Sequence, residues 1–536
     1  MENLLPILKR YAKPLGFALL AAAIGVMFCT VLWRAWVAED MYITFRVVDN
    51  FIAGHGLRWN IHERVQAYTH PLWMLLHIPV AAATGNIFLS NIILSVLCCW
   101  AALIVALMTM RKPPLLTVLY FLLPLYLSKS FMDYTTSGLE NPLSYLLFAA
   151  FGYVLLNCQQ HRYFWFYISL FVALSLFNRL DTVIVYLPVL AYLTLSRFTQ
   201  MRWVQIILGA LPLIGWLSFS LFYYGFLFPN TKYAKLGTGF DWSVYLAQGI
   251  EYYKHIWVFD LPGALLLTSS LVLLFNPRWL RSSSTLSFPR LPQCLGLSVL
   301  SYTLYVIYIG GDYMGGRFWA FPIFVSVWSL YAFLPLRVRA DIQFAIAAVL
   351  IAAHISIGYL GWLRWSCPTC IPIEGRLLDA INTFRANSLV RSEWPFVIRL
   401  EGHYPFAQEG RRIAEMYDVP AKQMFFVGMT AYYAGAKAPI VDMLGLTDPL
   451  IARLPAVPEQ KFYPAHFRRI IPRGYYKAID TGSLEDMHPA LAIYYDKLRL
   501  ITSGNLLDSQ RLKTIILFNL GYYDDWKNAY LYATRR

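Results

Sequence analysis

Charged residues are scarce in this sequence. Asp, Glu, Lys and Arg make up 14% of its 536 residues, whereas a soluble domain carries roughly 25%, so the composition excludes an ordinary soluble domain. The sequence also lacks an internal repeat of fixed period and any low-complexity tract. Transporters are often built from repeated halves, so the missing repeat disfavours a transporter.

Acidic residues are the minority among these few charges, with 30 Asp and Glu against 45 Lys and Arg and a net charge of +15. In a soluble protein this excess of positive charge would suggest a nucleic acid as the binding partner. In an apolar chain, Lys and Arg in short loops set the membrane topology and meet anionic lipid. We therefore expect the lipid bilayer as a partner and no nucleic acid.

No acidic triad has metal-ligand spacing, so the sequence predicts no required cofactor and leaves a divalent cation optional.

Cysteines are also few, and the seven are scattered. Cys29, Cys98 and Cys99 lie in apolar runs, where they are expected to act as small hydrophobic residues. Cys367 and Cys370 form a Cys-Pro-Thr-Cys motif, without two further ligands at metal-site spacing. A local disulfide is therefore favoured there over a metal or redox site.

Hydrophobic residues make up 58% of the chain, and many form membrane-length runs. The first run, Phe17–Trp33, follows Lys9, Arg10 and Lys13, which favours a cytoplasmic N-terminus. No small-residue cleavage site follows it, so we expect an uncleaved first helix.

The predicted fold class is a polytopic α-helical membrane protein with about eleven transmembrane helices. The apolar stretch Pro71–Ala83 is shorter than the roughly 20 residues that cross a bilayer, so we expect it to lie in the outer interface. With that assignment, the short basic loops fall on the cytoplasmic side. The other expected spans are 87–110, 113–130, 139–158, 163–178, 182–197, 203–224, 259–276, 293–311, 317–335 and 341–362.

The chain divides into two predicted domains. Residues 1–362 form a transmembrane domain with an external loop at 34–86, and residues 363–536 form a soluble extracytoplasmic domain. Strand-like runs at Gln423–Gly428 and Pro439–Val441, bounded by Gly, Pro and Asp, predict a mixed α/β fold for the second domain.

The most informative stretch, from Glu39 to Trp73, follows the first apolar run. Glu39 and Asp40 are adjacent acids where the chain leaves the bilayer, which is costly unless they face water or a substrate. The alternative is that one of them caps the following helix. The polar loops all fall on the outward side in the expected topology, which predicts an outward-facing active site. These loops are 39–70, 133–141, 178–181, 224–254 and 310–317.

This stretch resembles the first external loop of the GT-C glycosyltransferases, integral-membrane enzymes that use polyprenyl-phosphate sugars. The closest resemblance is to their arabinofuranosyltransferase-type members. Further motifs resemble that family in the same order along the chain: YTHPLW (68–73), SGLE (137–140), NRLD (178–181), YYG (223–225), PNTKYAK (229–235), GGDYMGGRF (310–318), VDMLGLTD (441–448) and PAH (464–466).

Sugar transfer to a hydroxyl needs a carboxylate to take the acceptor proton and cations to stabilise the departing phosphate. The resemblance implies that Asp40 is this base and that Glu39 matches the first family acid. The sequence departs from the family's motifs at His70, which replaces a serine, and at Ala465, which replaces a glycine. The substrate-binding candidates are Arg46, His70, Glu140, Arg179, Asp181, Lys232, Lys235, Asp312, Arg317 and His466.

Several of these candidates also have a structural interpretation. Arg46 could be a surface charge, and Arg179 and Asp181 could neutralise each other. Lys232 and Lys235 could contact anionic headgroups.

The resemblance implies an enzyme that transfers a sugar, D-arabinofuranose, from a polyprenyl phosphate to an extracytoplasmic glycan or a protein such as a pilin. The expected location is the cytoplasmic (inner) membrane, with the active site on the extracytoplasmic face. Two alternatives stay open: a mannosyl- or aminoarabinosyl-type transferase of the same family, and a lipid-linked sugar transporter or flippase.

Overall fold

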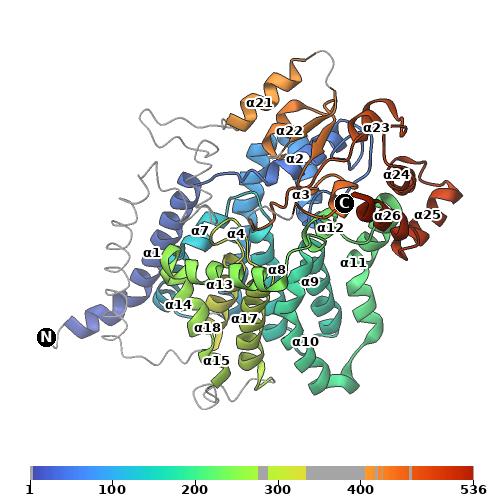
Figure 1. Ribbon diagram of the computed structural model, residues 1–536. Helices are drawn as coiled ribbons and strands as arrows, with labels where there is room; N and C mark the ends of the chain where they lie inside the picture. Colours follow the sequence, from blue (N-terminus) through green and yellow to red (C-terminus); the bar gives the residue numbers. More distant parts are fainter. Residues whose placement is uncertain are drawn as a thin grey trace.

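The structure is a computed structural model that describes residues 4–110, 112–275, 288–333, 405–416, 420–424, 427–457 and 462–534. Most of the described chain is helical. Long apolar helices fill the lower part of the molecule in Figure 1, and shorter elements gather at the upper end. The expected span at 341–362, the Cys367–Cys370 pair and the domain boundary near residue 363 lie outside the described residues.

Five helices in the described part of the chain are long and apolar enough to cross a membrane, and a bent helix pair would make a sixth. Each lies where the sequence predicts a span, but the total of eleven stays a prediction. Four of them are Gly16–Trp33 within α1 (Leu4–Trp33), α4 (Ile87–Met110), α11 (Trp203–Tyr224) and α17 (Leu291–Tyr308). The fifth, Leu180–Gln200, consists of η2 (Leu180–Thr182), α10 (Val183–Arg197) and η3 (Phe198–Gln200).

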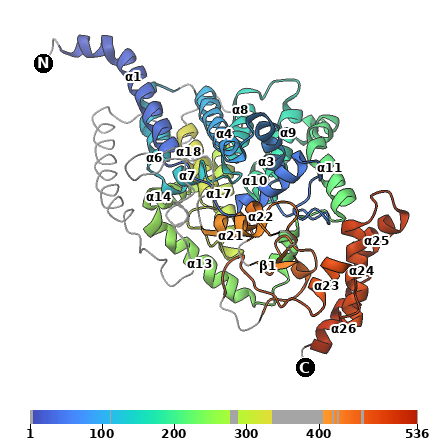
Figure 2. The ribbon, with the colours of Figure 1, turned by 90° about the horizontal axis from the view of Figure 1, so that it is seen from above.

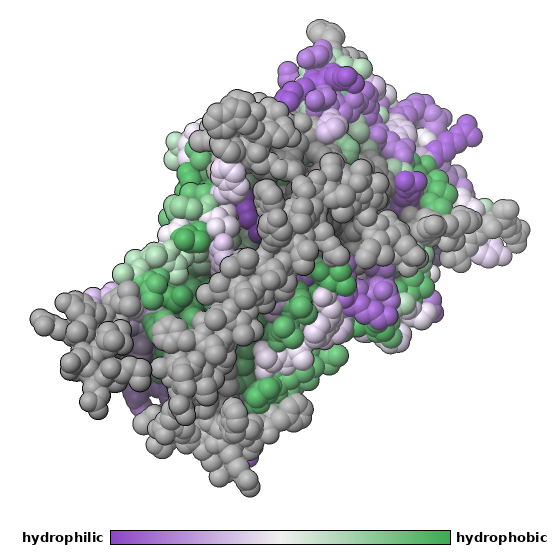
Figure 3. Space-filling model, turned by 90° about the vertical axis from the view of Figure 1, so that its left-hand side faces the viewer, coloured by the Kyte–Doolittle hydropathy of each residue, from purple (hydrophilic) through white to green (hydrophobic). Residues whose placement is uncertain are grey.

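Shorter helices pack among these long ones. The helix predicted at Pro71–Ala83 is present as α3 (Pro71–Thr84) and is too short to span. The others are α5 (Pro114–Thr117), the π-helix η1 (Val118–Leu122), α6 (Leu123–Leu127), α7 (Lys129–Tyr134), α8 (Asn141–Asn157), α9 (Phe164–Asn178), α15 (Val272–Phe275) and α18 (Ala320–Phe333). Figure 3 shows apolar side chains over the lower part of one face and polar side chains at its top, as a membrane protein requires.

A sharp bend separates α13 (Trp242–Phe259) from α14 (Leu261–Ser269), whose axes differ by 114°. Asp260 causes the break because its carboxylate accepts bonds from the Gly263 N–H (2.9 Å), the Ser128 hydroxyl (2.7 Å) and the Ser130 N–H (2.8 Å). The sequence predicted an external loop over residues 224–254. That prediction was incomplete, because α12 (Asn230–Leu236) and most of α13 lie there.

The C-terminal segment covers the upper end of the helices (Figures 1 and 2). The predicted strand runs overlap with β1 (Lys422–Met424) and β2 (Ile440–Asp442), which form a parallel pair with Lys422 opposite Ile440. Of the run predicted at Gln423–Gly428, only Gln423 and Met424 lie in a strand, and residues 425–426 lie outside the described residues. The helices of this segment are α21 (Pro405–Ala414), α22 (Met429–Ala434), η6 (Ile451–Arg453), α23 (Tyr475–Thr481), α24 (Pro489–Ser503), α25 (Ser509–Asn519) and α26 (Asp524–Thr534).

The C-terminal segment (residues 405–534) is joined to the segment around α2 (Met41–Ile52) through Arg46. This buried guanidinium donates to the carbonyl oxygens of Trp59 (2.7 Å), Ala431 and Ala438 (2.9 Å). One side chain therefore bonds three carbonyls and ties together segments far apart in the sequence.

A second arginine joins the C-terminal segment to α12. Buried Arg469 donates to the carbonyls of Leu454 (2.8 Å), Leu444 (2.6 Å) and Ala234. Asn230, at the start of α12, donates to the carbonyl of Gly445 (2.8 Å). The position of α12 therefore depends on the C-terminal segment.

Candidate active site

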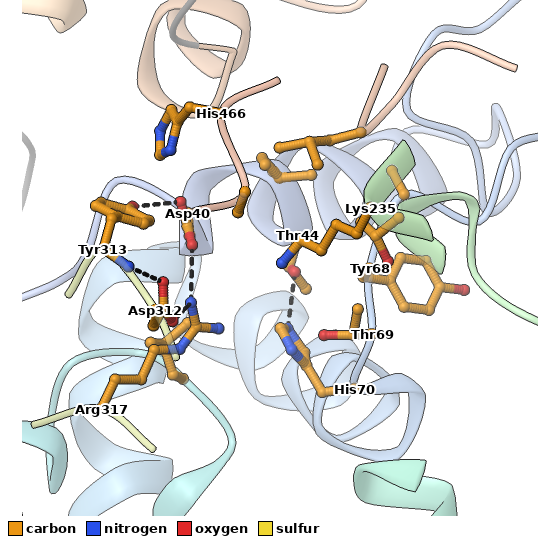
Figure 4. Close-up of a pocket in the computed structure, with 16 residues that line it drawn as sticks. Asp40, Thr44, Tyr68, Thr69, His70, Lys235, Asp312, Tyr313, Arg317 and His466 are labelled. Carbon is orange, nitrogen blue, oxygen red and sulfur yellow. Dashed lines mark hydrogen bonds and ion pairs between the residues drawn. The ribbon is translucent and has the colours of Figure 1, made fainter. Parts of the chain in front are cut away.

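A chain of charged groups crosses the polar pocket drawn in Figure 4. Asp40 directly precedes α2, but its side chain makes no capping bond to that helix. Instead, one carboxylate oxygen accepts the Tyr313 hydroxyl (2.8 Å) and the other accepts Arg317 Nη1 (3.0 Å). The same nitrogen donates to Asp312 (2.9 Å). The Asp40 side chain is 27% exposed, against 10% for Arg317 and 4% for Asp312, so Asp40 is the more exposed of the two carboxylates.

Glycines shape the turn that carries Asp312 and Arg317. Gly310 and Gly311 have φ values of +86° and +68°, which favour glycine. A Cβ atom on Gly311 would lie 2.4 Å from the Tyr252 ring. Gly311 thus lets the turn approach an aromatic ring of α13.

Tyr313 and His466 form the wall beside Asp40. Their ring centroids lie 4.5 Å apart with the planes at 87°. The backbone N–H of Tyr313 donates to Asp312 (2.7 Å), so this tyrosine contacts both acids. Burial lowers the pKa of His466, which favours its neutral form. Tyr313 was missed among the sequence candidates, although it stands inside the Gly-Gly-Asp-Tyr-Met motif.

Ala465, at the position where the family has a glycine, adopts a backbone conformation that favours glycine. Its φ of 64° is left-handed, and it is the one non-glycine residue with positive φ in the described part of the chain. This conformation costs an alanine roughly 1–2 kcal/mol. The neighbouring His466 Nδ1 lies 2.9 Å from the carbonyl oxygen of Pro464, and the turn places the His466 ring at the pocket.

Lys235 reaches the opposite side of the pocket from α12 (Figure 4). Within the described residues its ammonium makes no hydrogen bond or ion pair. Burial lowers its pKa, while the nearby Asp312 and Asp40 act in the opposite direction. A half-buried cation near acids, without a direct partner in the described part of the chain, is suited to receive an anionic group.

A second charged cluster lies next to the first. Arg179 pairs with Glu140 and, through Nε, with Asp181 (2.7 Å). His70 connects this cluster to α2: its Nδ1 lies 3.1 Å from Glu140 Oε2, and its Nε2 shares a hydrogen bond with Thr44 (2.9 Å). The expected Arg179–Asp181 ion pair is therefore present, and Glu140 is its second acidic partner.

Two adjoining cavities meet at these residues. The polar pocket has a volume of about 570 Å³, and a wider groove beside it about 1840 Å³, both measured to their open mouths. Lys232 lies in the wall of the groove, with its ammonium 3.5 Å from the Phe228 ring centroid. Both cavities share Thr69, Thr231, Lys235, Asp312 and Ala465. Aromatic side chains line much of the groove: Phe228, Phe240, Trp242, Tyr245, Tyr305, Tyr308, Phe318, Phe462 and Phe467.

The chain is similar to two terminal β-(1→2)-arabinofuranosyltransferases. The protein from Corynebacterium glutamicum is 29% identical over 460 residues, which cover 75% of this chain and 61% of that protein. The protein from Mycobacterium tuberculosis is 28% identical over 343 residues, which cover 56% of this chain and 53% of that protein. The chain thus spans less than two thirds of the length of these curated relatives. No family model matches it.

Glu39 and Arg46 do not line either cavity. Glu39 is buried and accepts the backbone N–H of Met429 (2.9 Å). Burial, with a smaller contribution from Asp40, raises its pKa to about 8. Arg46 is buried too, so interpreting it as a surface charge was wrong. Both residues hold the C-terminal segment against the segment around α2, and we assign neither to the substrate.

The other predicted site residues are close to the two cavities. Asp40, His70, Lys235, Asp312, Arg317 and His466 line the polar pocket, and Arg179, Asp181 and Lys232 line the groove. Glu140 contacts Arg179 and His70 behind them. Among the residues that the structure describes, no three His, Cys, Asp or Glu side chains are grouped to hold a metal ion, and the optional divalent cation stays a prediction.

Proposed function

We propose that this chain is a membrane glycosyltransferase that transfers D-arabinofuranose from a polyprenyl phosphate to an extracytoplasmic glycan or glycoprotein. The observation that carries the proposal is the position of Asp40. It is a partly exposed carboxylate, held by Arg317 and Tyr313, in a polar pocket that adjoins an aromatic groove. The names of the two relatives support the choice of sugar.

In the proposed reaction Asp40 takes the proton of an acceptor hydroxyl. The acceptor oxygen forms a bond to the anomeric carbon while the bond from that carbon to the phosphate oxygen breaks. The electron pair of the broken bond leaves with the polyprenyl phosphate. The anomeric centre becomes cationic on the way, so proton removal and phosphate stabilisation both lower the barrier.

Lys235 is the proposed partner of the departing phosphate. It belongs to the walls of both cavities and has no direct partner in the described part of the chain. Arg317 was also expected to bind the phosphate, but its Nη1 is occupied by Asp40 and Asp312. We assign Arg317 chiefly to orienting Asp40. Lys232 and Arg179 extend the positive charge into the groove.

The groove is the proposed site of the prenyl chain. Its aromatic walls offer apolar surface to an isoprenoid, and its junction with the polar pocket lies at Lys235. A lipid bound there would place its phosphate near Lys235 and its sugar toward Asp40. This arrangement keeps the apolar chain and the polar reaction in separate cavities.

The donor can be tested with the purified protein in nanodiscs. Radiolabelled polyprenyl phosphates carrying arabinose, mannose or aminoarabinose would be supplied with an acceptor glycan. We expect label to enter the acceptor from the arabinose donor. If only mannose or only aminoarabinose is transferred, the proposed donor sugar is wrong. If intact donor moves across a vesicle membrane without a new glycosidic bond, the protein is a flippase.

The orientation can be tested separately with reporter fusions. We expect a cytoplasmic N-terminus and an extracytoplasmic reporter signal after residue 534. A cytoplasmic signal there would place the candidate active site on the wrong face and contradict the proposed donor and acceptor compartment.

A further inference from the structure

Helix α25 carries an apolar stripe on the side that faces away from the protein. Leu512, Ile516 and Leu520 follow one another at intervals of four residues and are 36%, 61% and 77% exposed. At about 100° per residue, these positions fall within about 80° of the helix circumference. Their neighbours Leu507 and Tyr522 are also exposed, at 79% and 68%. Such a contiguous apolar surface marks a site of contact with another apolar phase.

The buried side of α25 seats it on the outer end of α11. Arg511 donates to the carbonyls of Phe222 (2.9 Å) and Tyr223 (3.0 Å), which belong to the last turn of α11. Asn519 donates to the carbonyl of Gly225 (2.8 Å), just beyond that helix. Figure 2 shows α25 at the rim of the molecule beside α11.

Helix α11 itself has the properties of a lipid-facing span. It is one of the candidate membrane helices, with only 17% of its most apolar window buried. Its exposed large side chains include Ile207, Leu211, Ile214 and Phe222. The end of a spanning helix marks the edge of the hydrocarbon, so α25 lies at the depth of the interface and its stripe continues the lipid-facing surface.

We propose that α25 is an interfacial helix that inserts Leu512, Ile516 and Leu520 into the outer leaflet. The exposed Lys513 beside the stripe is placed to reach anionic headgroups. This contact holds the C-terminal segment down on the membrane next to α11. It does not depend on which sugar the protein transfers.

Photo-crosslinking tests the proposal in the full-length protein. The photoreactive amino acid p-benzoylphenylalanine would be placed at position 516, where the side chain is exposed and its replacement leaves the packed face intact. The protein would be irradiated in nanodiscs of phosphatidylcholine and phosphatidylglycerol, and adducts read by mass spectrometry. The control position is 412 on α21, where the arginine side chain is 77% exposed on a different helix of the same segment.

We expect phospholipid adducts at 516 and at least ten-fold fewer at 412. In a protein that also carries the L512S and L520S substitutions, lipid adducts at 516 should decrease several-fold. Absence of lipid adducts at 516, equal yields at the two positions, or adducts at 516 to a protein instead of lipid would overturn the proposal.

Discussion

One nitrogen of Arg317 holds two carboxylates, because its Nη1 lies 3.0 Å from Asp40 and 2.9 Å from Asp312. Asp312 is only five residues away in sequence, whereas Asp40 is 277 residues away. The buried ion pair of Arg317 and Asp312 thus supports the more exposed Asp40 side chain. This geometry orients Asp40, and it leaves the phosphate to other cations.

Replacing Asp40 tests the proposed base. Asp40→Asn preserves the shape of the side chain but removes its capacity to accept a proton. Because general base catalysis contributes about 10²–10⁴-fold, we expect at least a 100-fold loss of turnover with an unchanged melting temperature. Glu39→Gln is the matched control and should cost much less, because Glu39 faces Met429. Near-normal turnover of purified Asp40→Asn would exclude Asp40 as the base.

Tyr313 is predicted to position Asp40. Tyr313→Phe removes the hydroxyl that donates to Asp40 and keeps the ring against His466. A hydrogen bond to a charged group contributes about 1.5–3 kcal/mol, so we expect kcat to fall roughly ten- to a hundred-fold with little change in KM. Tyr463→Phe is the control, because this nearby ring makes no hydroxyl hydrogen bond in the described part of the chain. Equal effects of the two substitutions would argue against a specific role for Tyr313.

Lys235 and Arg317 are predicted to act on different parts of the reaction. Lys235→Ala should weaken binding of a polyprenyl-phosphate analogue roughly ten- to a hundred-fold, the effect of one lost charge-assisted contact. Lys235→Arg should be milder. Arg317→Lys should mainly lower kcat, since an ammonium cannot reproduce the guanidinium geometry.

Calorimetric titration of each variant measures donor affinity. Lys232→Ala is measured for comparison, because Lys232 lines the groove but not the polar pocket. Unchanged donor affinity in Lys235→Ala would remove Lys235 from the phosphate site. If Arg317→Lys loses more donor affinity than Lys235→Ala, Arg317 is the residue that binds the donor phosphate.

Glu39 predicts a pH dependence of stability. Its pKa is raised from an ordinary 4.5 to about 8, so the folded protein retains a proton that the unfolded chain releases. The stabilisation is full below about pH 4.5 and is lost as the pH rises toward 8, at no more than about 1.4 kcal/mol per pH unit. Glu39→Gln should flatten this dependence while still accepting the Met429 N–H. Parallel melting curves of both proteins between about pH 5 and pH 8 would contradict the assignment.

Arg46 is predicted to affect stability instead of catalysis. Arg46→Lys retains the charge, but one ammonium cannot reach the three carbonyls of Trp59, Ala431 and Ala438. The Trp59 carbonyl keeps the Asn50 Nδ2 donor (3.0 Å). A buried carbonyl left without any donor costs about 1–3 kcal/mol, so we expect a clear decrease in melting temperature. Donor affinity of the folded fraction should be unchanged. A raised donor dissociation constant at an unchanged melting temperature would restore Arg46 to the substrate site.

The sequence by itself determined the helical membrane character, the places of the apolar helices and the two short strands, because these depend on hydrophobic runs and local turn residues. It also located the motifs that line the cavities. Only the tertiary structure distinguished the role of Glu39 from that of Asp40. These adjacent acids have the same local surroundings in sequence, but their side chains leave the backbone in different directions. Glu39 meets Met429, 390 residues away, and Asp40 meets Arg317, 277 residues away.

The same reason explains the other differences. Arg46 became a structural residue because its three carbonyl partners come together only in the folded chain. Tyr313 entered the site because its hydroxyl reaches a distant acid, and neither partner carries a local signal of that contact. A single sequence records which groups are available, whereas burial and long-range contacts decide which of them face the substrate and which hold the protein together.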